Sequence, residues 1–259
     1  MDLGLKGKVA LVTAASKGLG KASAMGLAAE GARVAICART QADVTAAADE
    51  IRAKTGGEVL AIPCDVTRPA DVEALMKQVS GRFGGIDVLI ANAGGPPRGN
   101  FEEFEDEQWR LAFELSLLSV VRLIRAVLPS MKERRWGRVI AIQSASVKQP
   151  LTGLLLSNAV RPGTAGLIKT LANEYGRYNI LFNTVCPGRI MTDRLLGGHK
   201  QAGKSVEEYL KGLGQDIPVE RVGTPEEFAN MVVFLASERA SYVNGVAIQV
   251  DGGMVRGLL

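Results

Sequence analysis

The sequence predicts an α/β fold in which a doubly wound parallel sheet of about seven strands is flanked by helices on both faces. Seven short aliphatic runs do not alternate with polar residues, as expected for strands that are covered on both sides. Amphipathic stretches lie between these runs, and such alternation implies parallel strands joined by right-handed crossovers. The 259 residues contain no linker, repeat or low-complexity segment, so we expect one domain over residues 1–259.

The strands are short and rich in β-branched or aliphatic residues. In chain order they are expected at Lys8–Thr13, Arg33–Ala38, Val59–Cys64, Val88–Ala91, Arg138–Gln143, Ile180–Cys186 and Val246–Val250. The helices are expected at Leu19–Glu30, Gln41–Lys54, Pro69–Phe83, Asp106–Lys132, Ser157–Tyr175 and Pro225–Ser237. Residues 189–218 are rich in Gly and charge and lack a clear pattern. Such a long loop is usually functional or mobile, so we expect a mobile substrate loop there.

Composition excludes several classes of protein. Hydrophobic residues make up 47% of the chain, which is ample for a core, and no apolar run is long enough to span a bilayer, so we expect no membrane partner. The net charge of +4 is mild, and aromatic residues are only 5%, which argues against nucleic acid. Cys37, Cys64 and Cys186 fall in strand-like runs, which predicts reduced core thiols and a cytoplasmic location. Their wide spacing, far from the single His199, predicts no metal site.

A Gly-rich turn follows the first expected strand, with the sequence Thr13-Ala14-Ala15-Ser16-Lys17-Gly18-Leu19-Gly20. Such a turn lets the backbone approach a pyrophosphate, and the helix that follows offers free N–H groups and a positive dipole end. Whether the turn can take this shape depends on the backbone angle φ of Ala14. Its methyl group is harmless if φ is negative and strained if φ is positive.

Three further segments stand at or near the ends of later strands: Asp65-Val66, Asn92-Ala93-Gly94, and Pro187-Gly188 with Thr192. Open α/β sheets bind ligands at the carboxyl ends of their strands. In this order, the segments resemble the motifs of the short-chain dehydrogenase/reductase family over nearly the whole chain. The pattern is similar to that of 3-oxoacyl-carrier-protein reductase-like members. The resemblance implies a Rossmann-like dinucleotide-binding domain and hydride transfer between a nicotinamide and a small-molecule carbonyl or alcohol.

The end of the second strand distinguishes between the two nicotinamide dinucleotides. An NAD site would place a carboxylate near Ala38 to accept a hydrogen bond from the ribose 2′-OH, and this position is apolar. Arg39 and Lys17 are suited to a 2′-phosphate, so we favour NADP(H) over NAD(H). The turn and the resemblance together assign cofactor binding to Thr13, Ser16, Lys17, Gly18, Leu19, Gly20, Arg39, Asp65, Val66, Asn92, Ala93, Gly94, Arg161, Pro187, Gly188 and Thr192.

The segment from Ser144 to Arg161 departs from the family. The family carries Ser, then Tyr thirteen residues later, then Lys four residues after that. Here Ser144 is followed by Ser157 and Arg161, and Ser116 stands where the family has Asn. A Tyr with a pKa of ~10 can be tuned for proton transfer, whereas an aliphatic hydroxyl is a far weaker acid and Arg is a poor proton relay.

Pro162 and Gly163 follow Arg161 directly. Because Pro disrupts a helix interior, we expect this helix to start later than in the family or to kink near Pro162.

Several groups are candidates for the missing proton donor. Lys148 lies four residues after Ser144, and we include it with Ser144, Ser157, Arg161 and Ser116 as a catalytic candidate. His199, Tyr209, or a water held by Ser144 and Ser157 are alternatives. Arg98 or Arg189 is available for an anionic substrate group.

Two functions remain open at this point. The first is an NADP(H)-dependent oxidoreductase of carbonyl or alcohol substrates with a non-standard proton donor. The alternative is an NADP(H)-binding, non-catalytic relative that acts as a sensor or assembly partner. The resemblance also implies a homo-oligomer, either a dimer or a tetramer.

Overall fold

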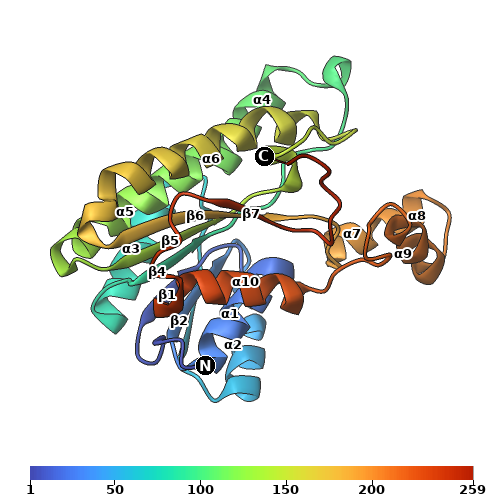
Figure 1. The fold of residues 1–259 in the computed structure, drawn as a ribbon. Coiled ribbons are helices and arrows are strands. Elements are labelled where there is room, and N and C mark those ends of the chain that lie inside the picture. Colours follow the sequence, from blue (N-terminus) through green and yellow to red (C-terminus); the bar gives the residue numbers. More distant parts are fainter. Residues whose placement is uncertain (259) are drawn as a thin grey trace.

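The chain folds around one seven-stranded parallel sheet with the strand order β3-β2-β1-β4-β5-β6-β7 (Figure 1). The computed structural model describes residues 1–258. The order reverses between β1 and β4, which makes the sheet doubly wound and confirms the predicted fold class. The strands are β1 Val9–Val12, β2 Arg33–Ala38, β3 Val59–Pro63, β4 Val88–Ala91, β5 Gly137–Ile142, β6 Ile180–Pro187 and β7 Ala247–Val250.

Helices cover both faces of this sheet. Figure 1 shows α1, α2 and α10 on one face and α3, α5 and α6 on the other. The longer helices are α1 Gly18–Ala29, α2 Gln41–Thr55, α3 Pro69–Phe83, α4 Asp106–Phe113, α5 Ser119–Arg134, α6 Leu155–Tyr175 and α10 Pro225–Ala236. Three short helices complete the set, α7 Asp193–Leu196, α8 Gly198–Gln201 and α9 Val206–Gly214.

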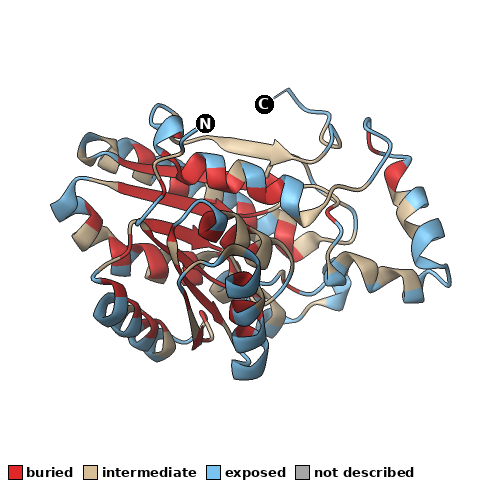
Figure 2. Cartoon of the chain, turned by 90° about the horizontal axis from the view of Figure 1, so that it is seen from below, coloured by how far each residue is buried: buried red, intermediate tan, exposed pale blue. Residues whose placement is uncertain are grey.

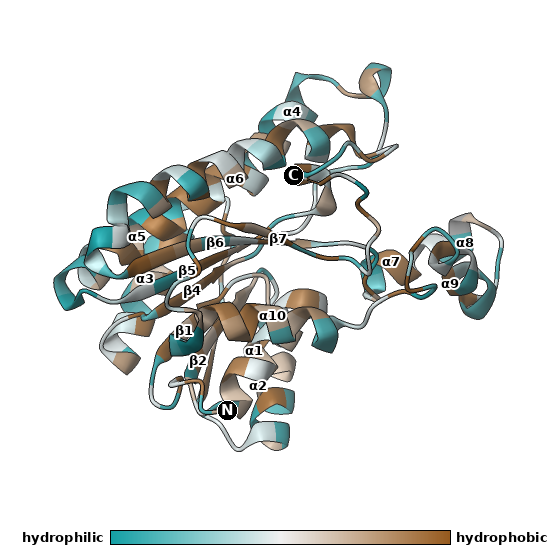
Figure 3. Ribbon diagram, viewed as in Figure 1, coloured by the Kyte–Doolittle hydropathy of each residue, from teal (hydrophilic) through white to brown (hydrophobic). Residues whose placement is uncertain are grey.

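The core consists of two apolar layers, one on each face of the sheet. Along β1, Ala10 and Val12 pack with α1, α2 and α10, whereas Val9 and Leu11 pack with α3, α5 and α6. All four side chains are buried. Figure 2 shows the central strands as largely buried and β7 as only partly buried, and Figure 3 shows apolar residues along the central strands. Burial on both faces explains why the strand sequences are continuously apolar.

The expected helix over Asp106–Lys132 is interrupted by a π-helical turn. The helix α4 ends at Phe113, the turn spans Glu114–Leu118, and α5 follows from Ser119. Ser116 therefore lies inside this turn. A π-helical turn inserts one residue into the helical repeat, and such turns often occur at functional sites. Nothing in the apolar periodicity of this segment predicts it.

The region expected to be one long loop over Arg189–Pro218 is largely helical. It contains α7, α8 and α9, which project beside the carboxyl ends of the strands (Figure 1). A capping box explains α9, because the Ser205 hydroxyl accepts from the Glu208 N–H and the Glu208 carboxylate accepts from the Ser205 N–H. These helices are too short for periodicity to reveal them.

The helix α6 starts close to its expected first residue and is continuous across Pro162. The helix begins at Leu155, ahead of Ser157, and continues through Pro162. Its entry is fixed by Asn158, whose side chain exchanges hydrogen bonds of 3.0 and 2.9 Å with the backbone of Leu151. Pro162 has no N–H, so the helical hydrogen bond to the Asn158 carbonyl is missing while the helix still propagates.

The three cysteines occupy the sheet as expected. Cys37 lies in β2, Cys64 directly follows β3, and Cys186 lies in β6. All three are free thiols with buried side chains. Within residues 1–258, no helix is both long and apolar enough to cross a bilayer.

Candidate active site

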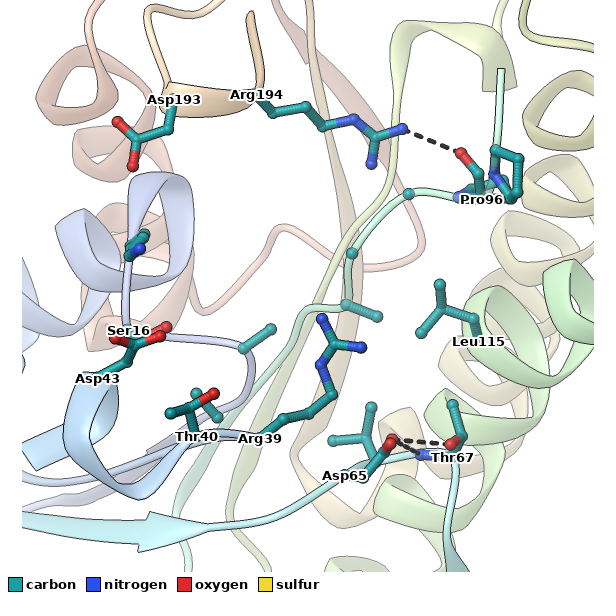
Figure 4. Close-up of a pocket in the computed structure, with 18 of the residues that line it drawn as sticks. Ser16, Arg39, Thr40, Asp43, Asp65, Thr67, Pro96, Leu115, Asp193 and Arg194 are labelled. Atoms are coloured by element: carbon teal, nitrogen blue, oxygen red, sulfur yellow. Dashed lines mark hydrogen bonds between the residues drawn. The ribbon is translucent and has the colours of Figure 1, made fainter. Parts of the chain in front are cut away.

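A cavity of about 870 Å³ opens at the carboxyl ends of the first four strands (Figure 4). Its lining comes from the turns that follow β1, β2, β3 and β4, together with residues of α4, of the π-helical turn and of α7. It lies where the strand order reverses between β1 and β4, the place at which open α/β sheets bind ligands. Of the residues expected to bind a dinucleotide, those on its wall are Ser16, Lys17, Arg39, Asp65, Val66, Ala93 and Gly94.

The Gly-rich turn holds Ala14 at φ +48°. This is the positive value at which the sequence predicts a strained backbone for a residue with a methyl group. Gly18 is also left-handed, at φ +55°. Gly20 is required for close packing, since a Cβ there would lie 2.5 Å from the Ala14 carbonyl oxygen. The helix α1 begins after Lys17, whose side chain makes no cap hydrogen bond, so the first N–H groups of the helix can meet an anion.

Thr13 and Asn92 hold this turn against β4. The Thr13 hydroxyl donates to the Asn92 carbonyl at 2.6 Å and accepts from the Asn92 N–H at 2.9 Å. Both residues therefore position the turn without lining the cavity. Gly18 lines a smaller adjoining hollow of about 310 Å³. Thr192 caps α7. Its side chain also lies against Gly18, where an added Cβ would be 3.2 Å from the Thr192 Cγ2.

Lys17 and Arg39 stand exposed at the cavity, and neither belongs to an ion pair among the described residues. Figure 4 shows Arg39 extending from the end of β2 into the space between the walls. Asp43, from the first turn of α2, also lines the wall and was not singled out from the sequence.

Asp65 is turned toward its own loop. Its Oδ1 accepts from the Thr67 N–H at 3.0 Å and from the Thr67 hydroxyl at 2.7 Å (Figure 4). The Asp65 N–H in turn donates to the Asp71 carboxylate at 3.0 Å. Val66, next along the chain, supplies an apolar surface to the cavity.

The candidate reaction residues form a separate polar cluster at the end of β5. The Ser144 hydroxyl accepts from the Ser146 N–H at 3.1 Å, and the Ser146 hydroxyl lies 3.0 Å from the Ser157 hydroxyl. Ser157 and Arg161 lie one turn apart on α6. The structure therefore brings Ser144, Ser157 and Arg161 together, while none of the three lines the large cavity. Ser146 was missed from the sequence, because a second Ser in a loop carries no signal of its own.

Arg161 is a buried cation, with 6% of its surface exposed. Its Nη1 donates to the Gln143 carbonyl at 3.1 Å and to the Gln143 side-chain oxygen at 3.2 Å. No carboxylate pairs with it among the described residues. Burial lowers the pKa of the guanidinium to about 10, and the positive charge of Arg194 acts in the same direction.

Ser116 does not hydrogen bond to this cluster. It is 1% exposed, and its hydroxyl has no partner in the part of the chain that the structure describes. Its carbonyl oxygen accepts from the Thr164 hydroxyl of α6 at 2.8 Å. Thr164, which sequence reasoning missed, therefore ties α6 to the π-helical turn.

The other candidate proton donors occupy different surroundings. Lys148 follows the short 3₁₀ turn Ala145–Val147. Burial raises the pKa of the Cys186 thiol to about 11, and the positive charges of Lys148 and Arg161 oppose that rise. His199 lies in α8, with its Nδ1 2.6 Å from the Leu196 carbonyl oxygen.

The remaining expected positions lie away from the cavity wall. Arg189 binds the Asp216 carboxylate at 2.9 Å, so it is not available for a substrate anion. Gly188 packs closely on Asp251, which leaves no space for a Cβ. Positions assigned to the cofactor that do not line the large cavity are Thr13, Gly18, Leu19, Gly20, Asn92, Arg161, Pro187, Gly188 and Thr192.

The family model that matches this chain is described as enoyl-(acyl carrier protein) reductase and covers residues 13–255. The chain is 36% identical over 254 residues to the 3-oxoacyl-[acyl-carrier-protein] reductase of Escherichia coli (strain K12), a match that spans 97% of this chain and 99% of that protein. The chain belongs to the short-chain dehydrogenase/reductase family.

Solved structures of this family agree with the fold over the whole chain. The L-sorbose reductase of Gluconobacter frateurii, complexed with NADPH and L-sorbose, matches with a TM-score of 0.96 and 38% identity over 100% of both chains. Actinorhodin polyketide ketoreductase with NADPH matches with a TM-score of 0.92 and 34% identity, over 96% of this chain and 98% of that one. Both reductases were solved with NADPH.

Proposed function

We propose that the protein is an NADP(H)-dependent oxidoreductase that transfers hydride to or from a small carbonyl or alcohol substrate. The observation that carries this proposal is the cavity at the switch point of the sheet, which joins an open helix N-terminus to two unpaired cations, Lys17 and Arg39. The NADPH complexes of its structural relatives support the same cofactor. When bound, the cofactor supplies the hydride. The protein supplies orientation, charge and a proton.

The residues around the cavity fit a dinucleotide phosphate. The left-handed Gly18 shapes the turn, and the N-terminus of α1 has no side-chain cap, so its first N–H groups would be free to bind a pyrophosphate. Arg39, with Lys17, would bind the 2′-phosphate, and the apolar Ala38 offers no acceptor to a 2′-OH. Asp65 and Val66 would flank the adenine. The other proposed contacts are Thr13, Ser16, Leu19, Asn92, Ala93, Gly94, Arg161, Pro187, Gly188 and Thr192.

We propose that Ser157 and Arg161 stand where the family carries its Tyr and Lys, and that the proton comes from a different group. Their spacing from Ser144 and their one-turn separation on α6 support this assignment. Ser157 is an unsuitable donor, because an aliphatic hydroxyl is a weak acid and this one already pairs with Ser146. Ser144 would orient the reacting oxygen.

Lys148 is the proton donor we favour. Ser144 and Lys148 stand at the two ends of the same short 3₁₀ turn, so Lys148 belongs to the surroundings of the reacting oxygen. In the reductive direction, the Lys148 ammonium would give its proton to the carbonyl oxygen as the carbon is reduced, and solvent would restore that proton to Lys148.

The test combines cofactor binding with a screen of ketones, aldehydes and ketoacyl thioesters. We expect tighter binding of NADPH than of NADH and turnover of at least one carbonyl class. Ser144→Ala and Lys148→Met should each lower kcat by roughly 100-fold or more, with NADPH affinity retained. Lys77→Met, at an exposed position on α3, is the matched control. Cofactor binding without turnover of any substrate would favour the non-catalytic alternative.

We also propose a homo-oligomer, either a dimer or a tetramer, in a cytoplasmic setting. Phe113 on α4 is 47% exposed, which leaves an apolar side chain for contact with a second copy. Three buried free thiols suit a reducing compartment. Residues 189–218 would act as the mobile cover of the substrate, with α7 and α8 moving with that segment.

A further inference from the structure

Two arginines reach the cavity beside the loop that follows β4. Arg194, from α7, spans the cavity, and its Nη2 donates to the Pro96 carbonyl oxygen at 3.0 Å (Figure 4). The guanidinium lies directly over the backbone of Gly95, because a Cβ at that position would be 2.6 Å from the Arg194 Cζ. Arg98 completes the same wall. The pair thus comes from segments about one hundred residues apart in sequence.

No carboxylate within residues 1–258 acts as a counter-ion to these two guanidiniums. Among the described residues, neither Arg98 nor Arg194 makes an ion pair. Burial lowers the pKa of Arg194, and the positive charge of Arg98 acts in the same direction, so the two cations repel each other. Asp193 does not relieve this repulsion, because Figure 4 shows its carboxylate directed away from the Arg194 guanidinium. An anion between the arginines would remove the repulsion.

The rest of this region suits the body of a small organic molecule. Leu111 and Leu115 line the cavity from the opposite helix. The phosphates of a dinucleotide already have the α1 N-terminus, Lys17 and Arg39 on the other wall. Arg98 and Arg194 are therefore cations in excess of what the cofactor needs.

We propose that Arg98 and Arg194 bind an anionic group of the substrate, a carboxylate or a phosphate, and so select oxo acids or phosphorylated ketones. This rests on the proposed function only in assuming that the substrate also carries the reacting carbonyl. Two forked guanidiniums can each bind an oxyanion through paired N–H donors, which gives geometric as well as charge selection. Arg194 would leave the Pro96 carbonyl for the substrate anion.

The test is equilibrium binding to the NADP⁺-loaded full chain, measured by calorimetry. The probes are pyruvate, acetoacetate and levulinate, each against its methyl ester, and dihydroxyacetone phosphate against dihydroxyacetone. At least one anion should bind roughly tenfold or more tightly than its neutral partner. Arg98→Met and Arg194→Met should each abolish that preference while affinity for the neutral partner stays unchanged. Comparing the three carboxylates with their esters, and the phosphate with its alcohol, shows whether the arginines prefer a carboxylate or a phosphate.

Gly95→Ala provides a second variant that removes no charge. Its backbone φ is not left-handed, so the added methyl group acts only by displacing the Arg194 guanidinium, and the anion preference should fall in part. Arg110→Met, at an exposed position on α4, is the matched control. Because binding is measured without turnover, failure of hydride transfer would leave this result intact. Equal binding of every anion and its neutral partner, or variants that weaken only NADP⁺ affinity, would overturn the proposal.

Discussion

The Asn92 side-chain amide donates a hydrogen bond of 3.2 Å to the carbonyl oxygen of Ala14, the residue held at φ +48°. Asn92 follows β4 and Ala14 follows β1, so this bond joins the two strands at which the sheet order reverses. It helps to hold a non-glycine residue in a conformation that costs roughly 1–2 kcal/mol. The hydrogen bond from Asn92 therefore stabilises the Gly-rich turn in a conformation that is strained at Ala14.

Ala14→Gly should raise the free energy of unfolding by about 1 kcal/mol, because glycine adopts positive φ without a steric penalty. The neighbouring Ala15→Gly is the control, since Ala15 is buried at an ordinary φ and should lose stability instead. Urea unfolding at pH 7 measures both. If the two variants shift stability in the same direction, left-handed strain at Ala14 is not the cause.

Arg39→Gln should weaken NADPH binding by roughly 10- to 100-fold and leave NADH binding nearly unchanged. The reason is that the guanidinium would meet only the 2′-phosphate, and hydrogen bonds to charged groups contribute about 1.5–3 kcal/mol. Fluorescence titration of both cofactors measures the effect. Arg68→Gln, at an exposed position before α3, serves as control. An equal loss for NADPH and NADH would assign Arg39 to a part that the cofactors share.

Arg161→Met should stabilise the protein by about 1 kcal/mol at pH 7 while weakening cofactor binding. The folded-state pKa of about 10 lies below the ordinary arginine value, so folding disfavours the charged form. This cost to the free energy of unfolding is fully present below pH 10, and it disappears only as the pH rises toward the ordinary pKa of arginine. Arg161→Lys keeps a buried charge and should not stabilise. Urea unfolding distinguishes them, and a destabilised Met variant would contradict the assigned cost.

Ser116→Ala should increase the free energy of unfolding by about 1 kcal/mol, because it removes a buried hydroxyl without a hydrogen-bond partner. Ser119→Ala is a close control in the next turn, since its hydroxyl donates to the Leu115 carbonyl at 2.6 Å and should not give this gain. Thermal unfolding measures both. A loss of stability at Ser116 would mean that the hydroxyl has a partner, such as an ordered water.

The sequence predicts the sheet well because continuous apolar runs mark buried parallel strands, and the bounds of β2 and β4 agree to the residue. It does not predict the π-helical turn, since one inserted residue barely alters an apolar stripe. It also misses α7–α9, whose caps act over only a few residues each.

In the candidate site too, residues marked by local sequence could be predicted, and residues brought together by the fold could not. Local sequence singles out the Gly-rich turn and Arg39, and of these Ala14, Ser16, Lys17 and Arg39 line the cavity. Arg194 could not be found, because its contact with Pro96 joins residues that are 98 positions apart. Thr164 likewise acquires its role only when α6 packs beside the π-helical turn.

The bond between Ser146 and Ser157 bears on any attempt to place a phenol at position 157. Position 157 is 7% exposed, and the Ser146 hydroxyl occupies the space directly ahead of it. A phenol ring introduced by Ser157→Tyr would have to displace that loop, which overpacks a closed region. We therefore expect Ser157→Tyr to need a second substitution that makes room, such as Ser146→Gly, before a phenol fits at this position.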